Sequence, residues 1–233
     1  MITPQDTRLW HALPLDQVYQ DLETDTQQGL SSATAQARLA TFGPNQLAEG
    51  KKVTVLEMFL EQFKDFIVLT LIAAAFIAGL LGEMVDTIAI VGIVILNAII
   101  GVVQEYLAEK ALAALKQLAA PTALVTRDGE TKTITSSELV PGDVIALRSG
   151  DLVPADARIV AAHMLKIEEA TLTGESSAVE KIPSDSIIQE TGIADRVNMA
   201  HAGTIVVRGR GHAVVTSTGM QTQLGKIAGL VAS

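Results

Sequence analysis

Two uncharged apolar runs dominate the hydrophobic pattern of this chain. The first covers residues 66–82 (FIVLTLIAAAFIAGLLG) and the second covers residues 87–103 (TIAIVGIVILNAIIGVV). Both are at the short end of the length that crosses a bilayer as a helix, and flanking residues can extend them. Neither run shows the repeating polar face of a globular helix. The pattern therefore predicts two membrane-spanning helices rather than two buried helices of a soluble core.

The link between the two runs, residues 83–86, contains two acids and no basic residue. It is too short for a domain, so the two spans are expected to be antiparallel neighbours. Lysines flank the pair on its outer sides, at positions 51, 52, 64, 110 and 116. By the positive-inside rule, both ends of this integral membrane protein are then cytoplasmic, with a plasma or inner membrane expected.

Strong helix formers continue beyond the second run, over residues 104–119 (QEYLAEKALAALKQLA). Leu107, Ala111, Leu115 and Leu118 fall on one stripe there, and Pro121 ends the pattern. We expect the second span to continue as a cytoplasmic stalk helix. Residues 51–120 therefore form one predicted segment, a two-helix transmembrane hairpin with its stalk.

The region before the hairpin, residues 1–50, has a helical pattern in two short pieces. Pro14–Leu22 and Ser32–Phe42 are the predicted helices. Ser32 is the candidate N-cap of the second helix, and Gly43-Pro44 is expected to stop it.

The region after the hairpin, residues 121–233, has the pattern of short strands. Residues 123–134 (ALVTRDGETKTI) predict a hairpin with its turn at Asp128-Gly129, and residues 144–148 and 157–162 predict two further strands. A second hairpin is expected around residues 209–211. Short strands at roughly 8–12-residue spacing are typical of a β sandwich or a distorted jelly roll. The remaining predicted element is a helix over residues 223–231.

Composition narrows the function further. Nearly half of the residues are apolar, and the net charge of −9 argues against a nucleic-acid partner. No cysteine is present, which excludes disulfides and thiolate chemistry. The four histidines show no metal-ligand spacing, so no metal site is predicted at His11, His163, His201 or His212. The P-loop pattern is also absent, and we predict no cofactor bound by this chain.

One short stretch has candidate chemistry. Thr173, Gly174, Glu175 and Ser176 follow an acidic pair in the sequence EEATLTGESSAVEK, residues 168–181. Glycine adopts conformations that other residues avoid, and Thr and Ser compete with the backbone for hydrogen bonds. These residues are therefore expected to form a loop that presents the carboxylate of Glu175. Taken alone, the same pattern also suits an ordinary capped turn.

The sequence around this stretch resembles the actuator domain of type-II P-type cation-transporting ATPases, the branch that includes calcium pumps. The resemblance is carried by residues 138–160 (ELVPGDVIALRSGDLVPADARIV), 172–181 (LTGESSAVEK) and 201–231, in the order and spacing of that family. GLSSATAQARLATFGPNQL resembles the N-terminal segment of the family, and LEQFKDFIVL and NAIIGVVQEYLAEKALAALKQL resemble its first two membrane helices. The resemblance covers the chain from about residue 10 onward.

This resemblance implies a cytoplasmic β-rich actuator and hence an α+β membrane protein. In such a pump, ATP with Mg2+ phosphorylates an aspartate in another domain, and the actuator then rotates onto it. Glu175 matches the family glutamate that positions and activates the hydrolytic water, while Thr173, Gly174 and Ser176 shape the loop. A carboxylate that is ionised at neutral pH has the chemistry for this role.

The departures from the family limit what the chain is expected to do alone. The D-K-T-G-T phosphorylation motif, the T-G-D and G-D-G-x-N-D segments, and the nucleotide-binding domain are not in this sequence. We therefore expect a pump fragment or truncated product that does not hydrolyse ATP by itself. Its expected partners are membrane lipid, the remaining pump domains in cis or in trans, and the transported cation, with Ca2+ the first choice. The alternative is a stand-alone, membrane-anchored actuator that binds or regulates a pump without catalysis.

Overall fold

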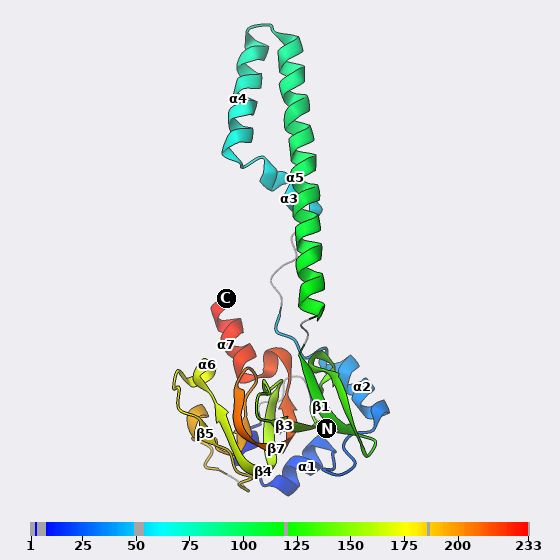
Figure 1. The fold of residues 1–233 in the computed structure, drawn as a ribbon, viewed down its shortest axis with the longest axis vertical. Coiled ribbons are helices and arrows are strands. Elements are labelled where there is room, and N and C mark those ends of the chain that lie inside the picture. The colour runs from blue at the N-terminus through cyan, green and yellow to red at the C-terminus, as the bar shows by residue number, and fades with distance from the viewer. Residues whose placement is uncertain (1–2, 4–7, 49–53, 119–120, 186, 233) are drawn as a thin grey trace. The chain divides into compact units, whose positions relative to one another are not determined.

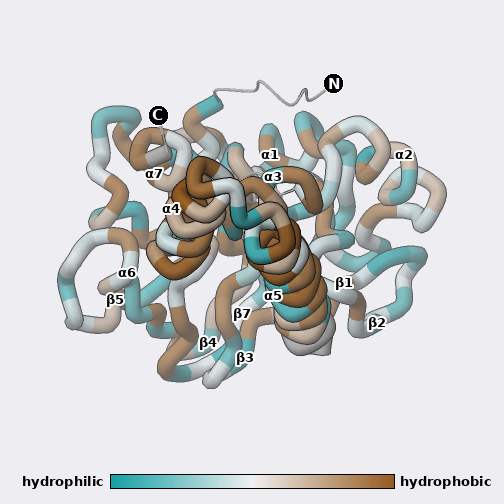
Figure 2. Tube along the Cα trace, turned by 90° about the horizontal axis from the view of Figure 1, so that it is seen from above, coloured by the Kyte–Doolittle hydropathy of each residue, from teal (hydrophilic) through white to brown (hydrophobic). Residues whose placement is uncertain are grey.

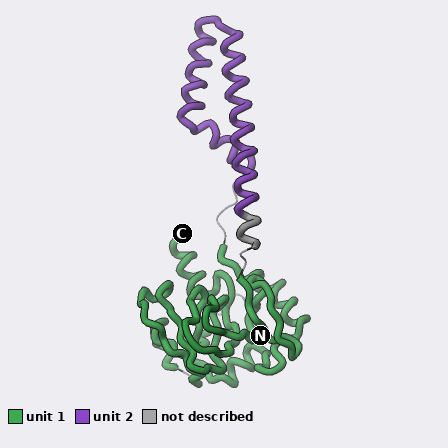
Figure 3. Tube along the Cα trace, in the orientation of Figure 1, with its two compact units in different colours: residues 1–48, 120–233 green, residues 49–119 purple. Residues whose placement is uncertain are grey.

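The computed structural model describes residues 3, 8–48, 54–118, 121–185 and 187–232, with only the helical backbone of residues 113–118. The chain divides into two compact units (Figures 1 and 3). One unit comprises residues 1–48 and 120–233, and the other comprises residues 49–119. The first unit is called the β unit below and the second the helical unit. The predicted segment boundaries at residues 50/51 and 120/121, and also Lys51 and Lys52, lie outside the described residues.

The helical unit contains α3 (Val55–Gln62), α4 (Phe66–Leu80) and α5 (Met84–Leu118). Thr54 and Glu57 form a capping box at the start of α3, and the Asp65 side chain caps α4 by accepting from the Ile67 N–H. Both α4 and α5 pack against each other and are apolar around most of their circumference (Figure 2). The helices predicted over the two apolar runs are therefore present.

Among the described residues of this unit, one helix is long enough by itself to cross a membrane. Met84–Leu112, within α5, passes tests of length and hydropathy. The 15-residue α4 is about 22 Å long at 1.5 Å per residue, which is less than the ~30 Å bilayer core. It reaches a spanning length only together with α3, from which it is bent by 64°. The predicted helical continuation of the second run is present, because α5 continues without interruption to Leu118.

The N-terminal elements of the β unit are η1 (Trp10–Ala12), α1 (Leu15–Leu22) and α2 (Ser32–Phe42), so both predicted helices are present. The predicted N-cap was wrong by one residue. Ser31, not Ser32, caps α2, and its Oγ accepts a hydrogen bond from the Thr34 N–H. Ser32 instead donates from its backbone N–H and hydroxyl to the Asp128 carboxylate, which ties α2 to the turn of the first hairpin.

The described strands form one antiparallel sheet in the order β2-β1-β3-β7-β4-β5, with β6 paired to β4. The strands are β1 (Thr122–Arg127), β2 (Glu130–Thr135), β3 (Val144–Arg148), β4 (Asp156–Glu168), β5 (Val179–Glu180), β6 (Met199–Ala200) and β7 (Ile205–Ser217). The hairpin predicted at Asp128-Gly129 is confirmed, because both residues have positive φ angles of 56° and 76°. This β-rich unit with its helices agrees with the α+β class.

The second predicted hairpin, around residues 209–211, was wrong. These residues lie inside β7, which pairs with β3 on one side and β4 on the other. The glycines have another use there. Gly209 has φ +78°, and a Cβ on it would lie 2.2 Å from the Met164 carbonyl oxygen, so β7 can approach an irregular part of β4. Turn-like glycines therefore mark a bulged pairing rather than a chain reversal.

The core of the β unit lies against both faces of this sheet. The main cluster includes Val125, Leu147, Ile159 and Val206, all of which are buried. A second cluster joins the N-terminal helices to the sheet, with Trp10, Val18 and Leu22 packed near Val144 and Val214. The remaining elements are η2 (Ser136–Glu138), α6 (Ala170–Thr173), η3 (Ile193–Asp195), η4 (Gly219–Gln221) and α7 (Gln223–Ala232), the last confirming the predicted C-terminal helix.

Candidate functional site

The Thr-Gly-Glu-Ser stretch lies just after the 13-residue strand β4. Strand β4 ends at Glu168, a single helical turn, α6, ends at Thr173, and the chain reaches β5 at Val179. Gly174 is the C-cap of α6, with φ 79° and ψ −4°. The left-handed conformation at this position favours glycine and redirects the chain away from the helix. Glu175 and Ser176 therefore lie in an exposed loop.

Hydrogen bonds within the loop connect three of the four predicted site residues. The Thr173 hydroxyl donates to the Glu169 carbonyl at 3.1 Å and accepts from the Glu175 N–H at 3.2 Å. The Gly174 N–H donates to the Ala170 carbonyl at 2.9 Å. These bonds fix the backbone that bears Glu175. The described residues supply no comparable bond for Ser176.

The Glu175 side chain itself is free. It is exposed, and within the described part of the chain its carboxylate forms no hydrogen bond or ion pair. A Cβ placed on Gly174 would meet nothing within 4 Å, so the space beside the loop is open. Glycine is thus required at position 174 by its backbone conformation rather than by a neighbour within the β unit. The arrangement presents one unpaired carboxylate on a fixed backbone.

A buried ion pair, which the sequence analysis did not single out, holds the base of this loop. Lys181 Nζ lies 2.8 Å from Glu169 Oε1, and the side chains of both residues are at most 1% exposed. Apart from Lys181, the Glu169 carboxylate has no hydrogen-bond partner among the described residues. Burial lowers the pKa of Lys181, and the nearby charge of Glu169 opposes this shift. The pair therefore joins the residue before α6 to the residue after β5.

Further contacts attach the same loop to the neighbouring segment. The Thr171 hydroxyl donates to the Gly203 carbonyl at 3.0 Å, and Lys181 Nζ donates to the Arg196 carbonyl at 3.3 Å. The sequence signal for these anchors was the row of acids and one lysine that flank the Thr-Gly-Glu-Ser stretch. Sequence alone could not show that Glu169 and Lys181 are buried while Glu175 is exposed.

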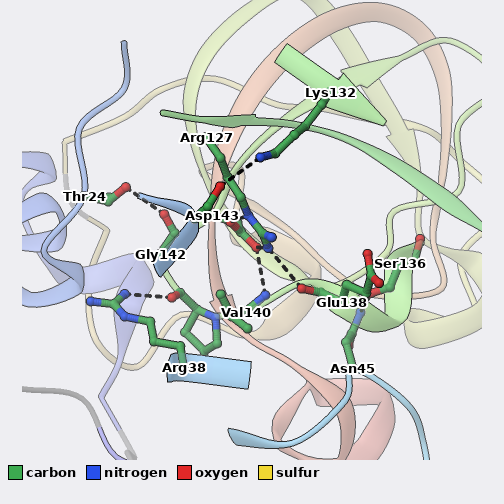
Figure 4. Close-up of polar contacts among 12 residues, drawn as sticks. Thr24, Arg38, Asn45, Arg127, Lys132, Ser136, Glu138, Val140, Gly142 and Asp143 are labelled. Carbon is green, nitrogen blue, oxygen red and sulfur yellow. Dashed lines mark hydrogen bonds and ion pairs between the residues drawn. The ribbon is translucent and has the colours of Figure 1, made fainter. Parts of the chain in front are cut away.

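A second acidic loop, Pro141-Gly142-Asp143, has the opposite character (Figure 4). The Asp143 carboxylate is fully buried and accepts from Arg127 Nε at 2.7 Å, from Arg127 Nη2 at 2.6 Å and from the Val140 N–H at 2.9 Å. Burial alone would lower the pKa of Arg127, but the hydrogen bond and charge of Asp143 raise it. This loop has no free acid.

The same loop binds the N-terminal segment. Arg38 donates to the Pro141 carbonyl at 2.8 Å and to the Leu22 carbonyl at 2.7 Å, and the Thr24 hydroxyl donates to the Gly142 carbonyl at 2.7 Å. The N-terminal helices are thus hydrogen-bonded to the sheet as well as packed on it.

Arg158, like Arg38, holds separate segments of the chain together by donating to backbone carbonyls. Its buried guanidinium donates to four backbone carbonyls, those of His11, Leu13, Ser184 and Asp185, at 2.6–3.2 Å. Burial lowers the pKa of Arg158 to about 10, which leaves it protonated at neutral pH. Arg158 thus joins the N-terminal segment to the chain that follows the Thr-Gly-Glu-Ser loop.

The four histidines do not form one site. His11 and His201 are buried; His11 Nε2 is within 3.2 Å of the Gln189 carbonyl, and His201 Nδ1 is 3.6 Å from the Asp156 carboxylate. His163 and His212 are exposed on the sheet. Within the described residues, no group of three or more His, Asp and Glu side chains is placed to hold a metal ion.

Two family descriptions match most of the chain. Residues 117–232 match the P-type ATPase actuator domain, and residues 10–78 match the cation transporter/ATPase N-terminus. The first match contains the described sheet and the Thr-Gly-Glu-Ser loop, and the second contains the N-terminal helices, α3 and most of α4.

Individual proteins similar to the chain are transport ATPases. The calcium-transporting ATPase of Bacillus subtilis (strain 168) is 46% identical over 224 residues, which cover 96% of this chain and 25% of the relative. A calcium-transporting ATPase of Listeria monocytogenes is 48% identical over 206 residues, 88% of this chain and 23% of the relative. The probable cation-transporting ATPase F of Mycobacterium tuberculosis (strain ATCC 25618 / H37Rv) is 42% identical over 225 residues. The chain spans about a quarter of the length of these relatives.

Proposed function

The chain belongs to the P-type cation-transporting ATPases, and on that premise we propose that Glu175 activates the water that hydrolyses an aspartyl phosphate. The observation that carries this proposal is the contrast around the loop. Glu175 is exposed and has no partner among the described residues, while the residues on either side of the loop are held by a buried ion pair and by hydrogen bonds. An acid that stabilises the fold through its charge has partners in the β unit, as Asp143 does.

The proposed step needs one proton acceptor. Water attacks the phosphorus atom, and the bond between phosphorus and the aspartate oxygen breaks. Glu175 takes a proton from the attacking water, and the aspartate leaves as a carboxylate while inorganic phosphate is released. Thr173 holds the backbone of Glu175, Gly174 turns the chain, and Ser176 completes the loop. Placing the acceptor on a fixed backbone reduces the entropy that the reaction step must lose.

ATP and Mg2+ are required by the complete pump cycle that we infer. The described residues of this chain offer no cluster of acids for Mg2+, so no step of the proposed chemistry passes through a metal held here. Phosphorylation by ATP and selection of the cation, which we infer to be Ca2+, are assigned to parts of a pump beyond this segment. In this proposal the β unit, with the fold of a distorted jelly roll, supplies the hydrolytic loop.

The helical unit is proposed to be the membrane anchor. In this proposal, α3 with α4 forms a bent first span and α5 forms the second. The 35-residue α5 is about 52 Å long, so it extends well beyond a ~30 Å bilayer core as a stalk. The acidic link near Glu83 then faces away from the cytoplasm, and both chain ends lie on the cytoplasmic side of a plasma or inner membrane. In this proposal the chain keeps the three predicted segments: the N-terminal segment 1–50, the membrane hairpin with its stalk 51–120, and the actuator 121–233.

A chimera tests the catalytic proposal. This chain would replace the corresponding quarter of the Bacillus subtilis calcium-transporting ATPase, to which it is 46% identical. We expect the chimera to hydrolyse ATP, and Glu175→Gln to lower turnover by about 10²-fold or more while phosphoenzyme accumulates. Glu180→Gln, an exposed acid on β5, is the matched control and should leave both unchanged. Normal turnover in Glu175→Gln would overturn the proposal.

A further inference from the structure

A groove on the sheet contains several basic residues and none of the Thr-Gly-Glu-Ser residues. It has a volume of about 650 Å³ and lies over the neighbouring strands β3, β7 and β4, which Figure 1 shows side by side. Arg148, His163, Arg210 and His212 line it, and all four side chains are exposed. These four residues are called the cationic groove below. They are gathered in a chain whose net charge is −9.

The strand register places these residues opposite one another. Arg210 on β7 is paired with Arg148 on β3 and with His163 on β4, so three basic residues form one row across three strands. His212 occupies the next position of β7 that points to the same side, opposite Ala146 and Ala161. Directly opposed like charges destabilise a sheet. A row of this kind therefore works against the stability of the β unit.

No acid among the described residues of the β unit forms an ion pair with this row. Within the described residues, none of the four side chains forms a hydrogen bond or an ion pair. The nearest carboxylate in sequence, that of Asp151, accepts from the backbone N–H of Arg148 at 2.8 Å. Ser149, on the rim, donates its hydroxyl to the Val207 carbonyl. The guanidinium donors of Arg148 and Arg210 thus remain available.

The backbone beneath the groove is adapted to keep it open. Its floor consists of small residues, among them Ala146, Ala161 and Gly211. Gly211 faces the other side of β7, where a Cβ would lie 2.5 Å from the Ala161 carbonyl oxygen and 2.9 Å from the buried Leu165 side chain, so the close β4–β7 pairing beneath the groove requires glycine there. The β4–β7 register shifts between His163 and Lys166, where Met164 has a φ of 49°. A bulge of this kind re-aims neighbouring side chains, and here it turns the chain beside His163.

From these observations we propose that the cationic groove binds a compact, soluble, phosphate-bearing ligand. Two guanidinium groups on adjacent strands are suited to several phosphate oxygens at once, because each presents a planar fork of donors. The volume lies within the range of small-molecule sites. This site is independent of the function proposed for Glu175, since it uses none of the same residues.

Calorimetric titration of the whole chain with inorganic pyrophosphate tests this site. The 233-residue protein would be held in phosphatidylcholine nanodiscs at 150 mM salt, so that weak nonspecific attraction is screened. We expect saturable binding with one pyrophosphate per chain, and Arg148→Gln and Arg210→Gln should each weaken it by about tenfold or more. Arg208→Gln removes the same charge from the same strand outside the groove and should weaken binding less than threefold.

The fold of the variants is checked by their thermal unfolding without ligand. Because Arg210 lies opposite Arg148, Arg210→Gln should leave the Tm of the β unit unchanged or raise it, while it weakens pyrophosphate binding. Three results would overturn the proposal: no saturable binding, an equal loss of binding in Arg208→Gln, or binding only to vesicles that contain phosphatidylglycerol. The last result would assign the groove to a lipid surface instead.

Discussion

The β unit contains two loops that look alike in sequence and differ in structure. Pro141-Gly142-Asp143 and Thr173-Gly174-Glu175 each place an acid directly after a glycine with positive φ, at 96° and 79°. Asp143 is completely buried and accepts three hydrogen bonds, whereas Glu175 is exposed and has no partner within the described chain. The comparison teaches that a glycine-acid pair indicates a turn, while the partners of the acid decide whether it stabilises the fold or remains available for chemistry.

The largest expected effect follows from removing the buried acid. Asp143→Ala leaves the Arg127 guanidinium buried without its carboxylate, so we expect a loss of about 3–5 kcal/mol in the free energy of unfolding. Glu175→Gln removes no contact and should change it by less than about 0.5 kcal/mol. Denaturant unfolding of the β unit in the detergent-solubilised chain measures both values. Equal losses would remove the distinction between the two loops.

The ion pair under the second loop gives the next largest effect. Lys181→Met leaves Glu169 buried without its charge partner, and we expect a loss of about 3 kcal/mol in unfolding free energy. Hydrogen exchange at the Glu175 amide should also become faster, because the base of its loop is released. The double variant Glu169→Leu/Lys181→Met replaces the pair with apolar side chains and should recover most of the stability. If Lys181→Met left both quantities unchanged, the pair would not hold the loop.

The two glycines sharpen the comparison at a smaller scale. Gly142→Ala should cost more than Gly174→Ala, because its Cβ would lie 2.3 Å from Arg38 Nη1 and 3.0 Å from the Leu22 carbonyl oxygen. Gly174→Ala meets no neighbour and should cost only the left-handed conformation, about 1–2 kcal/mol. Denaturant unfolding of the two variants under the same conditions shows which substitution lowers the free energy of unfolding more. The reverse order would contradict the packing described for Gly142.

The smallest effect concerns how the contribution of Asp128 to folding stability changes with pH. This acid joins the N-terminal segment to the first hairpin of the sheet. Hydrogen bonds from the hydroxyl and the backbone N–H of Ser32 lower the pKa of Asp128. A depressed carboxylate pKa stabilises the folded state above the ordinary value of about 3.9, and this stabilisation is lost as the pH falls through the lowered pKa. Asp128→Asn should therefore be less stable than the parent at pH 6, with a difference that shrinks below about pH 4.

Fluorescence of Trp10 provides the signal for that experiment. It is the single tryptophan of the chain, and it is buried where the N-terminal helices meet the sheet. Denaturant titrations at several pH values would compare the parent with Asp128→Asn. A stability difference that did not depend on pH would show that the Asp128 carboxylate does not act through its ionised form.

Local sequence signals predicted most of the fold. Apolar runs located α4 and α5, Gly43 ended α2, and Asp128-Gly129 formed the expected turn. Each of these features depends on neighbours in the chain. The glycines near residue 210 failed as a turn signal because β7 lies between β3 and β4, and that pairing depends on residues far away in sequence.

The candidate site was predictable only in part, for the same reason. The position of the loop followed from the glycine and hydroxyl residues around Glu175. The burial of Glu169 and Lys181 could not be predicted in this way. Charged residues are usually exposed, and these two are buried by packing between segments far apart in sequence. The cationic groove also depends on strand register, which places Arg148 beside Arg210 although they are far apart in sequence.

Decay of the phosphorylated enzyme tests the role of Glu175 most directly. In the chimera with the Bacillus subtilis calcium-transporting ATPase, phosphoenzyme would be formed with labelled ATP, and its loss would be followed after a chase of unlabelled ATP. We predict that Glu175→Gln forms phosphoenzyme normally and slows its decay by about 10²–10⁴-fold, while Glu180→Gln decays like the parent. Decay of Glu175→Gln at the parent rate would contradict the account.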